Sequence, residues 1–169
     1  MNSRGFSQVV STVILIALTI ALVGGLFVFI KGFVEGNLNS ASACNDVLEK
    51  ISLNLDYTCF DAATNSTLIS ISRKDFSLDS LLVSVSFEDS SKTFYLDKTE
   101  KVVDGVKNYK SSVLEVSLPE SESGKTYCIN GTTEAPLKIE IAPKKEGTQC
   151  EVVDSFTEIP TCSVSRTCA

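Results

Sequence analysis

Six cysteines are the residues of this chain whose type and number most directly predict chemistry. All of them lie in the last three quarters of the 169-residue chain, at Cys44, Cys59, Cys128, Cys150, Cys162 and Cys168. An even number of cysteines confined to one part of a chain predicts three disulfides formed in an oxidising compartment. Spacing does not choose the pairing. We expect Cys44 to pair with Cys59, fixing the end of an N-terminal helix to the first strand, and the other four to pair near the C-terminus.

The cysteines do not predict a metal site. The chain contains no histidine and no Cys-x-x-Cys pair, which removes the usual ligand sets for zinc. Without histidine there is also no Ser-His-Asp or Cys-His arrangement, and disulfide-bonded cysteines cannot act as nucleophiles. We therefore expect no metal, no other cofactor and no enzymatic activity.

Two tripeptides match the N-glycosylation sequon, namely Asn65-Ser66-Thr67 and Asn130-Gly131-Thr132. Both lie beside predicted turns, in the part of the chain that holds the cysteines. They are either glycosylation sites at Asn65 and Asn130 or ordinary asparagine-containing turns, and so short a motif does not choose between these alternatives.

A long apolar run near the start must place the rest of the chain. Between Arg4 and Lys31 no residue is charged, and most are Val, Ile, Leu or Phe. As a helix rising ~1.5 Å per residue, the run 5–30 is ~39 Å long, against ~30 Å of bilayer hydrocarbon. Its apolar residues lie on all sides of the helix, which excludes a helix that faces solvent. The run therefore predicts a helix that spans a membrane or lies in a packed bundle.

Removal of this helix as a secretory signal is the competing interpretation. Ala41-Ser42-Ala43 before Cys44 matches a small-residue cleavage site. However, the polar stretch 31–40 separates that site from the apolar run, whereas signal peptidase cuts close to the end of an apolar core of about 7 to 15 residues. We therefore expect the helix to be retained.

A different processing pattern lies at the very start. The segment 4–8, RGFSQ, followed at once by the apolar run, resembles the class III signal peptides of archaeal type IV pilins and archaellins. The resemblance implies that a prepilin peptidase cuts between Gly5 and Phe6. It places Gln8 at the third mature position, where the family often has Gln. The bacterial branch has Glu at the fifth mature position, where this chain has Val10, so the resemblance is to the archaeal branch.

The same resemblance implies a function. Subunits of this family are held in the membrane by the helix and then extracted by a membrane platform and an assembly ATPase. Their helices pack together as the core of a homo-oligomeric filament, with the β domains outside. Such filaments serve adhesion, surface attachment or swimming, and we favour a pilus over an archaellum.

Small residues form a stripe along the predicted helix. Ala17, Ala21 and Gly25 are spaced by four residues, and Gly32 and Gly36 continue approximately the same face. Small residues at this spacing let helix backbones approach closely. We expect neighbouring subunits to meet along this stripe, although Gly and Ala are also simply common in membrane helices.

The pattern becomes strand-like after residue 50. Short runs rich in Val, Ile, Leu and Thr are bounded by Gly, Pro, Asn, Asp and Ser. The predicted strands are 51–57, 67–72, 81–87, 93–96, 113–118, 125–129, 137–141 and 151–156. We expect 97–109 and 119–124 to be loops.

These patterns together predict an α+β chain in three parts. They are a leader at 1–5, a hydrophobic helix and neck at 6–50, and an extracellular antiparallel β-sandwich at 51–169. The net charge of −6 and the scattered lysines argue against nucleic acid binding. Two functional classes remain: a pilin-like filament subunit, which we prefer, and a single-pass membrane-anchored surface protein whose β domain binds an envelope or external ligand.

Overall fold

The computed structural model describes residues 4–163 and residue 168, and it describes side chains for 10–34, 44–163 and 168. The chain divides into two compact units, Met1–Ala41 and Ser42–Ala169. The prediction put the boundary at residue 50. It lies earlier because the residues just after Ala41 are fixed to the β unit, where Val47 is fully buried in the core.

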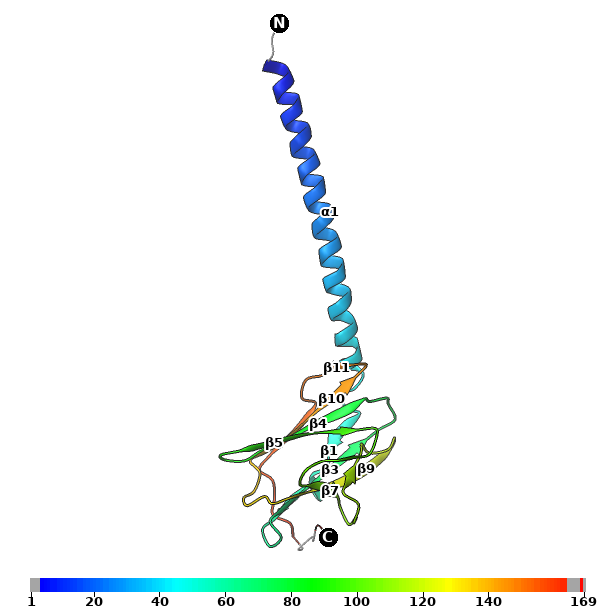
Figure 1. The fold of residues 1–169 in the computed structure, drawn as a ribbon, viewed down its shortest axis with the longest axis vertical. Coiled ribbons are helices and arrows are strands. Elements are labelled where there is room, and N and C mark those ends of the chain that lie inside the picture. The colour runs from blue at the N-terminus through cyan, green and yellow to red at the C-terminus, as the bar shows by residue number, and fades with distance from the viewer. Residues whose placement is uncertain (1–3, 164–167, 169) are drawn as a thin grey trace. The chain divides into compact units, whose positions relative to one another are not determined.

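The helix α1 spans Arg4–Asn45 and is continuous (Figure 1). It ends five residues before residue 50, the predicted limit of the helix and neck. The chain leaves the helix through tight turns in which the Val47 N–H bonds to the Cys44 carbonyl and the Lys50 N–H to the Val47 carbonyl. Glu49 adopts a left-handed φ of 65° there. These turns redirect the chain, so the helix does not continue to residue 50.

The second unit contains two five-stranded sheets, and every strand pairing in them is antiparallel. The strands of the first sheet, in order, are β1 (Ile51–Leu53), β3 (Ser66–Arg73), β9 (Ser123–Asn130) and β7 (Val106–Asn108), with β2 (Cys59–Asp61) also on β3. Those of the second are β11 (Thr148–Gln149), β10 (Lys138–Lys145), β4 (Ser80–Ser86) and β5 (Ser91–Asp97), with β12 (Asp154–Thr157) also on β10. A separate pair joins β6 (Lys101–Val102) to β8 (Glu115–Val116).

One hydrophobic cluster draws side chains from both large sheets. Ile69 and Ile71 of β3 belong to it together with Val83 of β4 and Ile139 and Ile141 of β10, and all five are fully buried. These residues alternate along their strands, as expected for sheets with one buried face. The α+β class, with an apolar N-terminal helix followed by antiparallel sheets, is thus confirmed.

The predicted strands agree with the structure where the alternation is long. Five predictions match β3, β4, β5, β9 and β10 within a few residues. The prediction at 51–57 is wrong in its second half, because the Asn54 side chain accepts a hydrogen bond from the Asp56 N–H and caps a 3₁₀ turn, η1 (Leu55–Tyr57).

Short strands account for the other differences. The segment 97–109, predicted as a loop, holds β6 and β7, and β2 and β11 were not predicted. At 113–118 and 151–156 only β8 and β12 are strands. Two to four residues are too few for a period of two to be visible in the sequence.

Candidate functional site

The described side chains of α1 form an apolar surface that no other described residue covers. Every residue from 10 to 34 is exposed, and the large hydrophobic side chains there keep between 42% (Val34) and 73% (Phe29) of their surface open. Exposing that much apolar surface to water costs on the order of tens of kcal/mol. The segment therefore requires an apolar environment supplied from outside the chain.

The segment Val10–Val34 is long and apolar enough to cross a membrane. A signal sequence near the N-terminus would pass the same test of length and composition. The expectation that the chain has a helix able to cross a membrane, by length and composition, is thus confirmed.

The small-residue stripe lies on this open surface. Ala17, Ala21, Gly25 and Gly32 are all exposed, and a Cβ added at Gly25 or Gly32 would meet no atom within 4 Å. The side-chain position of Gly36 lies outside the described part of α1. A closely approaching second helix would therefore meet no obstacle from the described residues at these positions.

The predicted leader cleavage site falls at the start of α1. Gly5 and Phe6 are both helical in the backbone, and their side chains lie outside the described set, as do residues 1–3 altogether.

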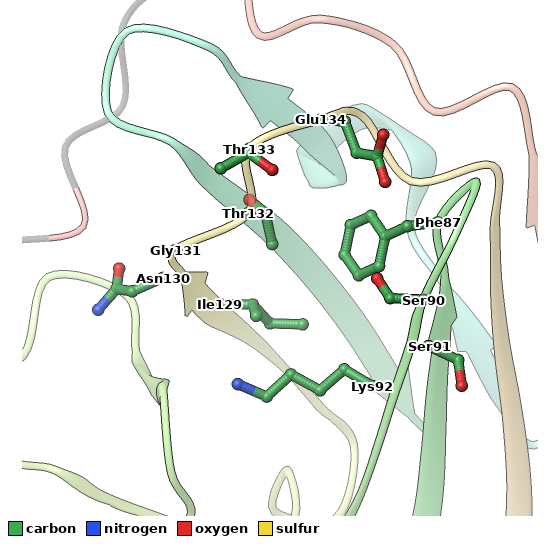
Figure 2. Close-up of a pocket in the computed structure, with 10 residues that line it drawn as sticks. All are labelled: Phe87, Ser90, Ser91, Lys92, Ile129, Asn130, Gly131, Thr132, Thr133 and Glu134. Atoms are coloured by element: carbon green, nitrogen blue, oxygen red, sulfur yellow. The ribbon is translucent and has the colours of Figure 1, made fainter.

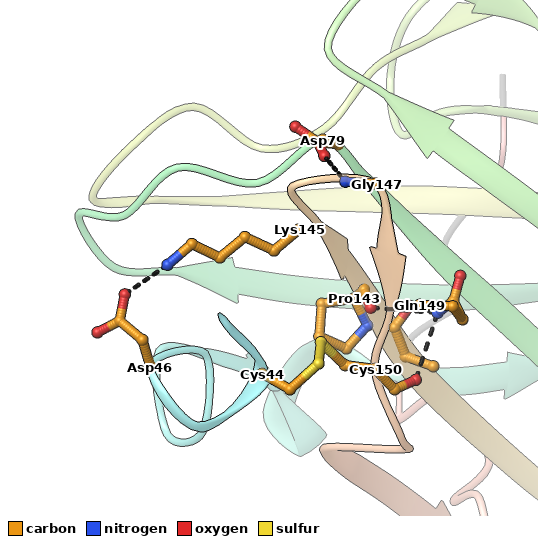
Figure 3. The surroundings of a disulfide bond; sticks show 9 residues. Cys44, Asp46, Asp79, Pro143, Lys145, Gly147, Gln149 and Cys150 are labelled. Atoms are coloured by element: carbon orange, nitrogen blue, oxygen red, sulfur yellow. Dashed lines mark hydrogen bonds and ion pairs between the residues drawn. A yellow bond between two sulfur atoms is a disulfide. The ribbon is translucent and has the colours of Figure 1, made fainter. Parts of the chain in front are cut away.

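A disulfide fixes the last turn of α1 to the β unit. Cys44 is bonded to Cys150, which directly follows β11, 106 residues along the chain (Figure 3). The prediction of Cys44 with Cys59 is wrong. Although Cys59 is much closer in sequence, it lies in β2 on the first sheet, whereas Asp46, just after the helix, binds Lys145 of β10 in the second sheet.

An ion pair lies beside this disulfide. Asp46 accepts hydrogen bonds from Lys145 Nζ at 2.7 Å and from Lys50 Nζ at 2.6 Å. The bond from Lys145 and then that from Lys50 lower the pKa of the Asp46 carboxyl to about 2. Lys145 is itself nearly buried. The sequence does not reveal the Asp46–Lys145 pair, because its only local signal is the spacing of Asp46 and Lys50, four residues apart.

The hairpin that carries Cys150 is held by further bonds (Figure 3). The Cys150 N–H bonds to the Pro143 carbonyl, and the Gln149 side-chain amide donates to the carbonyls of Ala142 and Pro143. Asp79 accepts the Gly147 N–H at 2.9 Å, a bond that lowers the pKa of the Asp79 carboxyl. The helix end is thus anchored on a well-bonded hairpin.

The other two disulfides also use the C-terminal segment. Cys59 pairs with Cys162, and Cys128 pairs with Cys168. Beside the first, the Phe60 N–H bonds to the Pro160 carbonyl and the Cys162 N–H to the Phe60 carbonyl. Because β12 of the same segment pairs with β10, the C-terminal segment joins both large sheets. All six cysteines are thus paired, as the sequence predicted.

The structure brings the two sequons together. Asn65 ends the turn before β3 and Asn130 ends β9, and the register pairs Ser66 with Asn130. Both asparagines are exposed. Nothing in the sequence indicated that motifs 65 residues apart are neighbours, because β3 and β9 are separated by five other strands.

A shallow hollow lies next to the second sequon, between the β4–β5 turn and the segment after β9. Figure 2 shows it between Phe87, Ser90 and Lys92 on one side and the stretch from Ile129 to Glu134 on the other. Its volume of about 200 Å³ is below the ~300–1,000 Å³ usual for small-molecule sites. Within the described residues, no group of three or more His, Cys, Asp or Glu side chains is placed to hold a metal ion.

Comparison with known proteins gives no assignment. No protein-family model, curated protein or solved structure matches this chain.

Proposed function

We propose that this chain is the structural subunit of an archaeal type IV pilus-like surface filament. Its apolar helices form the filament core, and its β units, each a sandwich of the two large sheets, form the outer surface. Before assembly the helix holds the subunit in the cell membrane, and afterwards the subunit is extracellular.

The single observation that carries the proposal is the helical surface at 10–34, apolar and exposed on every side. A bilayer covers such a surface, and so does a bundle of identical helices, because both are apolar surroundings. The same segment therefore suits both the subunit held in the membrane and the subunit assembled in the filament. A helix that only anchors a protein needs the first environment alone.

The residues that flank this surface agree with the proposal. Arg4 precedes it in a segment that resembles a class III signal peptide, and cleavage after Gly5 would remove that charge and begin the mature chain at Phe6. Lys31 lies near its other end. Loss of the leader charge leaves the N-terminal part of the helix free of charged side chains, as a filament core requires.

The bonds at the end of α1 support a role in which the subunit transmits tension. In a filament, tension on the outer surface passes to the core through the chain between helix and β unit. Cys44–Cys150 places a covalent bond at that point, and Asp46–Lys145 lies beside it. Under tension, the end of α1 therefore cannot separate from the β10–β11 hairpin unless the Cys44–Cys150 disulfide breaks.

The β unit is inferred to be a sandwich from its shared core. Side chains from β3 and β9 of one sheet and from β4 and β10 of the other form one cluster. Two antiparallel sheets that bury their faces against each other are typical of this architecture.

The mature N-terminus tests the proposal most directly. N-terminal sequencing of the protein from its native source should begin at Phe6. The variant Gly5→Leu should keep the leader and produce no filaments, whereas the leader variant Asn2→Ala should be cut and assemble normally. Electron microscopy of sheared cell-surface material, labelled with antibodies to the β unit, reads out assembly.

Other outcomes would contradict the filament role. A mature chain that keeps Met1 or Asn2, with label only on membranes, would indicate a permanently anchored surface protein. A mature chain that begins at Cys44 would mean that the helix is discarded.

A further inference from the structure

The two sequons share one corner of the first sheet. Ser66, the middle residue of the first, pairs in register with Asn130, the acceptor of the second. The Asn65 carbonyl accepts hydrogen bonds from the N–H groups of Gly131 and Thr132, both at 3.0 Å. Pairing of β3 with β9 thus fixes both tripeptides at once.

The hydroxyls that define the two motifs bind each other. Thr67 Oγ1 donates to Thr132 Oγ1 over 3.2 Å, and the two residues are 0% and 6% exposed. Asn65 and Asn130 remain exposed, and Figure 2 shows the Asn130 side chain directed away from Phe87. An enzyme that selects the sequon must reach both the asparagine and the hydroxyl two residues later. In the folded unit it reaches only the asparagines.

We propose that Asn65 and Asn130 are a paired N-glycosylation site that accepts glycans only before β3 and β9 pair. The donor is an oligosaccharide linked to a lipid phosphate. The bond formed joins the asparagine Nδ2 to the anomeric carbon of the first sugar. The bond broken joins that carbon to the phosphate, which leaves with the lipid, and the amide gives up one proton. Folding then buries both threonine hydroxyls and closes the site.

The disulfide pattern leaves time for this reaction. Each of the three native disulfides needs a cysteine from the last 20 residues, Cys150, Cys162 or Cys168. Both sequons therefore emerge from translocation before any native disulfide can form. Cys128, two residues before Asn130, lies opposite Leu68 of β3, and its partner Cys168 is the last cysteine of the chain, so this bridge next to the second sequon forms late.

This inference does not depend on the filament. It requires only that the β unit is exported to the side where glycans are transferred. A chain that is glycosylated but never forms filaments would contradict the proposed function and leave this inference standing. A chain that forms filaments but carries no glycan at Asn65 or Asn130 would contradict this inference and leave the proposed function standing.

The test compares folded and unfolded full-length chain as a substrate in detergent micelles. One sample is oxidised, and the other is reduced and alkylated at all six cysteines, which prevents refolding because Cys128 has no room for a larger group at 0% exposure. Each is incubated with an oligosaccharyltransferase and a lipid-linked oligosaccharide, and glycopeptides are read by mass spectrometry. Asn65→Gln and Asn130→Gln assign the two sites.

A matched control is available in the turn between β4 and β5. Asp89→Asn creates a sequon with Ser90 and Ser91, and all three positions are exposed. The folded control variant should be modified at position 89 alone, and its unfolded form at all three sites.

Three results would overturn the inference. They are modification of Asn65 or Asn130 in the oxidised sample, modification of the unfolded control at position 89 alone, and a folded control that is not modified at position 89 either. The last would mean that folding blocks transfer everywhere, so that the Thr67–Thr132 contact has no special role.

Discussion

The Asp46 carboxylate, in the turn that follows α1, accepts a hydrogen bond from Lys145 Nζ at 2.7 Å although 99 residues separate the two. Asp46 lies two residues after Cys44, whose disulfide reaches Cys150 beyond the same hairpin. A covalent bond at the end of α1 and an ion pair in the turn after it thus join neighbouring residues to the same hairpin. Changing each of them separately shows what each contributes.

The ion pair should make the stability of the β unit depend on acid. The pKa of the Asp46 carboxyl falls from 3.8 to about 2 in the folded chain. A lowered pKa contributes stability above the ordinary value, and that contribution is lost as the pH falls from about 4 towards 2. Urea midpoints of wild type and Asp46→Asn, followed by circular dichroism, should therefore differ at pH 6 and converge near pH 2.

Salt and a control variant separate this effect from general acid denaturation. The Asp46 side chain is half exposed, at 51%, so the difference should be modest and should shrink at ~1 M salt. Glu88→Gln, at an exposed carboxylate in the β4–β5 turn, should follow wild type at every pH. A constant gap between Asp46→Asn and wild type down to pH 2 would contradict the assignment.

Removing the Cys44–Cys150 disulfide should lower the stability of the β unit. This bridge closes a loop of 106 residues, and loss of such a bridge from a small exported domain typically costs about 2 to 5 kcal/mol. The double variant Cys44→Ser with Cys150→Ser should melt well below wild type in a thermal scan of the full chain. Ser77→Ala with Ser90→Ala, at two exposed serines, is the matched control, and equal melting temperatures for both double variants would refute the prediction.

Tyr127 should be the tyrosine whose hydroxyl matters most for stability. It is fully buried in β9, and its hydroxyl donates to the Ser117 carbonyl at 2.7 Å. Burial raises the pKa of this phenol. Tyr127→Phe leaves that carbonyl without its donor and should cost about 1 to 3 kcal/mol in urea unfolding. Tyr95→Phe, half exposed on β5, should cost nothing measurable, and a Tyr127→Phe variant as stable as wild type would show that the bond is dispensable.

Under the proposed function, Gly25→Leu should block assembly but not membrane insertion. A Cβ added at Gly25 meets no described atom within 4 Å, and added apolar surface favours insertion. A second helix that approaches closely along the stripe would be pushed away. Membrane fractionation should therefore find normal amounts of the variant, and electron microscopy should find few or no filaments. Val23→Leu, two residues away on the opposite side of the helix, should assemble normally, and wild-type filament numbers for Gly25→Leu would show that the stripe is not an interface.

Local patterns were enough to predict the long helix and the longer strands of this protein. The apolar run predicts α1, because about twenty-five neighbouring residues share one property and need no partner to reveal it. Alternation over seven or eight residues predicts β4 and β9, because a strand with one buried face shows a period of two. The even number of cysteines likewise predicts that all are paired.

Which elements meet was decided only by the tertiary structure. Cys44 bonds to Cys150 instead of Cys59, and Thr67 binds Thr132, because the order of strands in each sheet sets these neighbours. Strand order and register come from burying the faces of both sheets in one core, which depends on all the strands together. Periodicity along one strand carries no record of that choice. Local sequence therefore determined the long helix and the longer strands, and the shared core determined the short strands and which elements meet.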